Sequence, residues 1–138
     1  MNVPSKKLQA YERGVQAEQV AALYLRGQGY DVLEERYKTP VGEIDLIVGK
    51  GERIIFAEVK SHKSEEQALL AVTARSRRRI EAAAEHYIAH HEGIAGYEMR
   101  FDVLVVPPEI LKRSGHLANN LLGAVSVRHL DNAWLYGQ

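Results

Sequence analysis

The sequence predicts an α/β domain in which a mixed sheet of about five strands is flanked by helices, in the order α-β-β-β-α-β-β. Its 138 residues, of which 46% are hydrophobic and 26% charged, suffice for one globular domain with a real core. Two stretches show the apolar spacing of helices, and short apolar or alternating stretches lie between and after them. We therefore expect residues 1–138 to form a single domain.

Composition narrows the function classes before any motif is considered. Lys+Arg and Asp+Glu both number 18, so the net charge is zero and any binding of nucleic acid must come from local patches. The lack of cysteine excludes disulfides, thiolate metal sites and cysteine nucleophiles. The amino terminus has no apolar signal-peptide core, and no apolar run approaches the ~20 residues of a membrane span. We expect a cytoplasmic protein with no membrane partner.

Residues 8–26 are predicted to form the first helix, because apolar side chains beginning with Leu8 and Tyr11 recur at intervals of three, four and seven. Glu18 occupies the position that completes this stripe, so a carboxylate lies on the packing face. Either Glu18 takes part in a site, or it sits at the edge of the stripe and pairs with an arginine. Gly14 lies one turn earlier, where close approach of another backbone would account for a glycine.

Three strands are predicted to follow, at residues 30–37, 42–48 and 53–60. If residues 49–52 form a four-residue hairpin loop, Asp45 pairs with Phe56 and Glu43 with Glu58. Side chains alternate faces along a strand, so this register places Asp45, Glu58 and Lys60 on one face at one end of the hairpin. A loop of odd length would move Asp45 to the other face.

A second helix is predicted from about residue 68 or 73 to 91, after a polar segment at 61–67 that we expect to be mobile. Its first turns carry a basic cluster. The cluster comprises Arg75, Arg77, Arg78 and Arg79. Two interpretations stay open: a solvated helix end, where arginine opposes the helix dipole, or a patch that faces nucleic-acid phosphates.

The last third of the chain completes the predicted sheet. Residues 97–106 alternate and then become apolar, which indicates a fourth strand, and residues 125–130 are predicted to form a fifth. Asp102 is most simply a strand-edge or structural carboxylate. Residues 111–123 resemble a loop insertion, and Asp131 is expected to cap a short terminal helix.

The charged side chains of the predicted hairpin carry the functional argument, since burying an unpaired charge is costly. Carboxylates such as Asp45 and Glu58 are ligands that Mg²⁺ or Mn²⁺ prefers. Lys60 beside them can orient or deprotonate a water and offset charge on phosphorus. The alternative is an ion pair between Glu58 and Lys60, worth at most about 1 kcal/mol when exposed. That alternative leaves Asp45 unexplained.

These residues carry a family resemblance. G-E-I-D-L-I followed by F-A-E-V-K resembles the PD-(D/E)xK, or restriction-endonuclease-like, nucleases, and within them the YraN family, related to Holliday-junction resolvases. The likeness covers nearly the whole chain: G-V-Q-A-E with A-A-L-Y-L resembles the family's first helix and A-V-T-A-R-S-R-R-R-I its basic helix start. R-F-D-V-L-V-V resembles its fourth strand and H-L-D-N-A-W its last segment.

The resemblance implies a restriction-endonuclease-like sheet, nucleic acid as partner and a metal-dependent site. It implies Glu18, Asp45, Glu58 and Lys60 as that site, with Mg²⁺ or Mn²⁺ bound by the three carboxylates and by the carbonyl of Val59. The chain departs from the family at Ser76, where lysine is usual, and at Ser61-His62, where Thr-Arg is common. These departures bear on substrate contacts more than on metal binding. Resolvase-like enzymes act as dimers, so a homodimer is also implied.

Three functions follow as hypotheses. The first is a Mg²⁺-dependent endonuclease acting on DNA, including branched or structured DNA. The second is a nucleic-acid-binding module of the same fold with weak or no catalysis. The third is an adaptor that acts through a protein partner. No feature of the sequence demands this third hypothesis.

Overall fold

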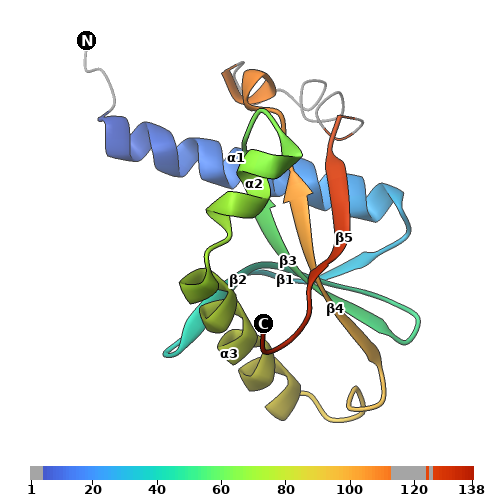
Figure 1. Cartoon of the computed structure of the whole chain (residues 1–138). Coiled ribbons are helices and arrows are strands. Elements are labelled where there is room, and N and C mark those ends of the chain that lie inside the picture. The colour runs from blue at the N-terminus through green and yellow to red at the C-terminus, as the bar shows by residue number, and fades with distance from the viewer. Residues whose placement is uncertain (1–4, 113–123, 125) are drawn as a thin grey trace.

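The computed structural model describes residues 5–112, 124 and 126–138 of the chain (Figure 1). The loop insertion predicted at residues 111–123 lies almost entirely outside this part, and only its start belongs to a described element. The elements, in chain order, are α1 (Lys6–Gly27), β1 (Asp31–Thr39), β2 (Gly42–Lys50), β3 (Arg53–Lys60), α2 (Glu65–Ala71), α3 (Ala74–Ala89), β4 (Glu98–Val105), the 3₁₀ helix η1 (Pro108–Lys112) and β5 (Arg128–Trp134).

The sheet has five strands in the order β1-β2-β3-β4-β5. The pair β3–β4 is parallel and the other neighbours are antiparallel, so the sheet is mixed, as predicted. The second predicted helix is in fact two, because Ser64 and Thr73 each cap a separate helix by accepting a backbone N–H. Residues 61–67, predicted as a polar segment between elements, therefore contain the start of α2.

Two hydrophobic cores lie on opposite faces of the sheet. On one face α1 packs against β1, β2 and β3 through small and branched side chains; its buried residues are Ala17, Val20, Ala21, Ala22 and Leu25. On the other face α2, α3 and the end of β5 cover Ile47, Phe56 and Phe101. The helices thus enclose the sheet from both sides (Figure 1). No helix in the described ranges is long and apolar enough to cross a membrane.

The predicted packing stripe of the first helix is wrong in its first turns. Leu8 and Tyr11 are 46% and 58% exposed, because the start of α1 projects beyond the sheet (Figure 1). The backbone contact expected at Gly14 is also absent, since a Cβ built there meets no atom within 4 Å. Open space, not close approach, lies beside this glycine.

The turn between β2 and β3 is shorter than predicted. Lys50 pairs with Arg53 and Ile47 with Phe56, so the loop has two residues and not four. Gly51 supplies the left-handed conformation of the turn, with φ +56°. Both lengths are even, so Asp45 keeps the predicted face although its opposite residue changes.

The carboxy-terminal segment forms a strand and not the predicted helix. At the irregular point of the β4–β5 pairing, Asn132 adopts φ +51° and donates its backbone N–H to Asp102 at 2.9 Å. Trp134 stacks on Phe101, with ring centroids 5.0 Å apart, and its indole N–H donates to buried Glu81. These long-range contacts outweigh the capping propensity of Asp131.

Candidate functional site

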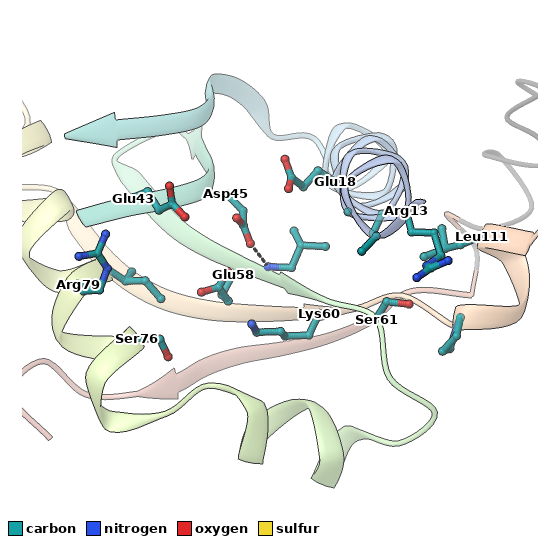
Figure 2. A pocket seen from close by; sticks show the side chains of 16 residues that line it. Arg13, Glu18, Glu43, Asp45, Glu58, Lys60, Ser61, Ser76, Arg79 and Leu111 are labelled. Atoms are coloured by element: carbon teal, nitrogen blue, oxygen red, sulfur yellow. Dashed lines mark hydrogen bonds between the residues drawn. The ribbon is translucent and has the colours of Figure 1, made fainter. Parts of the chain in front are cut away.

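The candidate site lies where β2 and β3 part. Their pairing runs from the turn to Leu46 opposite Ala57, and continuing it by one residue places Asp45 opposite Glu58. At this point the backbone N–H of Val59 donates to Asp45 Oδ2 at 2.8 Å (Figure 2). A side chain thus occupies the gap between the strands, and the strand ends are held apart around it.

The gap opens into a cleft of about 560 Å³, which we call the acidic cleft. It is bounded by α1, the ends of β2 and β3, the start of α3 and η1. Figure 2 shows carboxylates at its centre, between α1 and α3. Its charged lining residues are Glu18, Glu43, Asp45, Glu58, Arg13, Lys60 and Arg79. The four residues proposed for a metal-dependent site and Val59 therefore line one cleft.

Asp45 and Glu58 form a carboxylate pair with an unusual protonation balance. Burial, hydrogen bonding to Asp45 and the charge of Asp45 raise the pKa of Glu58 to about 9, whereas the charge of Lys60 lowers it. At neutral pH a carboxyl group with such a pKa holds its proton unless a cation replaces it. The pair is therefore suited to share either a proton or a metal ion.

Lys60 lies beside the pair without neutralising it. Among the described residues it forms no ion pair with Glu58, so the strand-end ion pair considered as an alternative is wrong. Its half-buried side chain lines the cleft with Glu58 (Figure 2). The ammonium group is thus available to a water or a phosphate that enters the cleft.

Glu18 is held by Arg36, as the second interpretation of this residue predicted. Arg36 Nε donates to Glu18 Oε1 at 2.7 Å and its Nη2 to Oε2 at 3.3 Å. Burial raises the pKa of Glu18, and the hydrogen bond from Arg36 opposes this. Arg36 itself has φ +51°, rare for a bulky residue, and its guanidinium lies 4.8 Å from the ring centroid of Tyr11. Glu18 faces the cleft but has a partner.

The donor set fits a hard cation in part. Asp45, Glu58 and the carbonyl of Val59 are oxygen donors of the kind that Mg²⁺ prefers, and both backbone groups of Val59 point towards β2, as they do in an extended strand. Glu18 is not free to join them while Arg36 holds both of its oxygens. Within residues 5–112, 124 and 126–138 no three His, Cys, Asp or Glu side chains are gathered as metal ligands.

The basic cluster contributes one side chain to the cleft. Arg79 lines it, whereas Arg75 and Arg78 are exposed elsewhere and the buried Nε of Arg77 has no partner among the described residues. Gly42 sets this placement, because a Cβ there would overlap the backbone carbonyl of Arg79. The start of β2 can therefore lie directly against α3.

Three further lining residues were not among the predicted site residues. Arg13 reaches the cleft from α1, Glu43 from β2, and Ser76 from the first turn of α3. A signal for the first existed: Ala10, Gly14 and Ala17 share its helix face and line the cleft with it, and small residues at helical spacing leave room beside a helix. Ser76 is the position where the family usually has lysine, so that departure falls inside the site.

Comparison with known proteins identifies the family. The model of the "Uncharacterised protein family UPF0102" matches residues 17–106, which include the whole carboxylate set. A UPF0102 protein of Bradyrhizobium diazoefficiens is 41% identical over 108 residues, covering 78% of this chain and 81% of its own. One from Parvibaculum lavamentivorans is 40% identical over 116 residues, covering 84% and 86%. The chain belongs to the UPF0102 family, which is the YraN endonuclease-like family.

Proposed function

We propose that this protein is a Mg²⁺-dependent endonuclease that hydrolyses phosphodiester bonds in DNA, including branched or structured DNA. The observation that carries the proposal is the carboxylate pair of Asp45 and Glu58 in an open cleft. Burial and the interaction with Asp45 raise the pKa of Glu58, and two carboxyl groups brought this close need a shared proton or a cation. A fold gains no stability from such a pair, so a ligand is the simpler reason for it.

The chain's own residues divide the proposed work. Asp45, Glu58 and the carbonyl of Val59 would hold Mg²⁺ or Mn²⁺, which when bound supplies Lewis acidity and lowers the pKa of a coordinated water. Lys60 orients or deprotonates the attacking water. Arg13 and Arg79, on opposite sides of the cleft, bind the phosphate and offset the charge that develops on it (Figure 2). Glu18 would join these oxygen donors once its ion pair with Arg36 is broken.

A second candidate, a nucleic-acid-binding module with little catalysis, is favoured by the ion pair of Glu18 with Arg36. If that pair persists when DNA binds, the cleft offers only two carboxylates. Ser76 points the same way. It lines the cleft from the first turn of α3, and its side chain adds no positive charge there. The module would bind phosphates through Arg13, Lys60 and Arg79 and leave the strand intact.

A cleavage assay tests the first candidate. We expect branched, duplex or single-stranded DNA to be cut with Mg²⁺ or Mn²⁺ and not with chelator, and Glu58→Ala to reduce cleavage by at least ~10²-fold. Glu85→Gln, an exposed carboxylate of α3, is the matched control and should retain full activity. No metal-dependent cut, or equal cleavage by Glu58→Ala, would exclude the endonuclease.

Calorimetric titration with Mn²⁺ separates the two candidates without relying on activity. The endonuclease requires metal binding that is lost in both Asp45→Asn and Glu58→Gln. DNA binding without any such metal binding would support the module. Because a four-way junction calls for two symmetric cuts, sedimentation with and without junction DNA would test the proposed homodimer.

A further inference from the structure

A second cleft, of about 630 Å³, lies at the same end of the sheet. It is formed by the chain that leaves β3, by η1 and by the start of β5, which meet near the top of Figure 1. Its polar lining residues are His62, Lys63, Glu109, Ser126 and Arg128. We call it the basic cleft, because among its described lining residues two permanent cations and a histidine face a single carboxylate.

The basic cleft continues from the acidic cleft. Lys60 and Ser61 line the acidic cleft, and the next two residues, His62 and Lys63, line the basic one. Pro108 lines both. Three residues of extended chain span at most about 10 Å, so Lys63 lies within one or two nucleotides of a phosphate held at Lys60.

The cations of the basic cleft are available for a ligand. Lys63 and Arg128 are exposed, and within the described part of the chain neither forms an ion pair. The chain has zero net charge, so this local excess does not follow from its composition. The acidic cleft differs, since its described lining has four carboxylates and three cations.

We propose that the basic cleft binds the phosphate backbone of the nucleic-acid strand adjacent to the phosphate in the acidic cleft. The proposal rests on the proposed function for its ligand. A polyanion that crosses both clefts meets the carboxylate pair at one point, where a metal ion would offset its charge, and beyond it two cations against one described carboxylate, Glu109. Phosphate contacts of this kind position a strand without reading its sequence.

The test is a binding measurement that needs no cleavage. Fluorescence anisotropy with a labelled 20-nucleotide single strand, in chelator and over a range of salt, compares wild type with the double variant Lys63→Ala/Arg128→Ala. The matched control, Lys7→Ala/Arg26→Ala, removes two exposed cations of α1 that line neither cleft. All three proteins should melt at nearly the same temperature, because the substituted side chains are exposed.

We expect the basic-cleft variant to bind about tenfold more weakly at ~0.1 M salt, and its salt slope to fall by about 1.4, or 0.7 for each lost phosphate contact. The control should match wild type. A basic-cleft variant indistinguishable from the control would overturn the proposal. So would millimolar inorganic phosphate binding to wild type that the variant loses while its DNA affinity is unchanged, which would indicate a site for free anions. If the variant itself melts early, Lys63→Gln/Arg128→Gln replaces it with the same expectation.

The outcome is separable from that of the endonuclease proposal. Weaker binding by Lys63→Ala/Arg128→Ala together with no metal-dependent cleavage by wild type would support the basic cleft and exclude the nuclease. Metal-dependent cleavage by wild type together with unchanged DNA binding by Lys63→Ala/Arg128→Ala would support the nuclease and exclude the basic cleft.

Discussion

Asp102 and Glu58 lie on adjacent strands of the same sheet, and their surroundings differ in kind. The Asp102 carboxylate is fully buried and accepts hydrogen bonds from Arg100 at 2.8 Å, His129 at 2.6 Å and the Asn132 backbone at 2.9 Å. Glu58, close to Asp45 and half-buried, has no ion-pair partner among the described residues. One carboxylate is satisfied by the fold, and the other depends on a proton or a ligand.

The contrast teaches how to separate structural from functional charge in this molecule. Asp102 joins β4 to β5, and a hydrogen bond of 3.1 Å between His129 Nδ1 and the Tyr24 hydroxyl extends the network to α1. Its function is structural, as the sequence predicted for this residue. The carboxylate pair contributes nothing comparable, since within the described part of the chain its one backbone donor, the Val59 N–H, serves Asp45. Four experiments would break or sharpen this distinction.

The largest effect is expected from Asp102→Ala. Removing this carboxylate leaves Arg100 and His129 as partly buried donors without an acceptor, which costs about 3 kcal/mol of unfolding free energy. Glu58→Gln, the matched substitution on the neighbouring strand, should be neutral or stabilising. Urea unfolding followed by circular dichroism measures both. Equal destabilisation by the two variants would remove the distinction.

The pH dependence of stability should have opposite signs at the two carboxylates. Burial raises the pKa of Asp102, but hydrogen bonds from His129, Arg100 and Asn132 outweigh it and lower the pKa below 3.8. Its stabilising contribution is therefore present above pH ~3.8 and lost as pH falls through the lowered value. Glu58 has a folded-state pKa of about 9 against 4.5, so the folded state binds the extra proton and stability falls as pH rises through that window.

Unfolding in chelator at several pH values checks the two signs. Glu58→Gln should abolish the loss of stability between pH 5 and about 9 and leave the acid limb unchanged. If the unfolding free energy of Glu58→Gln falls between pH 5 and about 9 as it does in wild type, the pH dependence assigned to Glu58 is wrong.

A smaller effect is expected from Arg36→Ala. The substitution releases Glu18 and removes a positive charge near the carboxylate pair, so Mn²⁺ should bind about fivefold more tightly, or ~1 kcal/mol. Arg36→Gly provides the matched variant, because it relieves the left-handed backbone as well. Calorimetry measures the affinity. If Mn²⁺ binds no more tightly to either variant, Glu18 has no part in metal binding.

The smallest effect on stability is expected from Lys60→Ala. Its side chain forms no ion pair with Glu58, so unfolding free energy should change by less than about 0.5 kcal/mol while cleavage is lost. A thermal melt beside the cleavage assay separates the two. A melting temperature lowered by several degrees with unchanged cleavage would make Lys60 a structural residue.

Periodicity accounts for what could be predicted of the site. The side-chain period of two placed Asp45 and Glu58 on one face, and any even turn length preserves that result, so the wrong loop length did no harm. The predicted bounds of β3, residues 53–60, also agree with the structure, since the same short-range pattern defined this strand. Helical spacing likewise placed Glu18 on the face of α1 that meets the site.

The failures concern long-range contacts. Arg36 could not be identified as the partner of Glu18, because it reaches that position through a left-handed residue in the irregular strand β1. The basic cluster could not be resolved into Arg79 and three others, since that depends on β2 packing against α3 at Gly42. The continuation of the fifth strand through residues 131–134 was missed, because contacts with Asp102, Phe101 and Glu81 hold it.

Local sequence thus sufficed for the fold class, most strands and the shared face of the carboxylates, since these follow from short-range periodicity. Tertiary packing set the electrostatic state of each charge, because burial and partners come from distant parts of the chain. Asp102 and Glu58 illustrate the division. Both were visible as carboxylates inside apolar strands, but only the arrangement of Arg100 and His129 around one, and of Asp45 beside the other, distinguishes a structural charge from a candidate ligand.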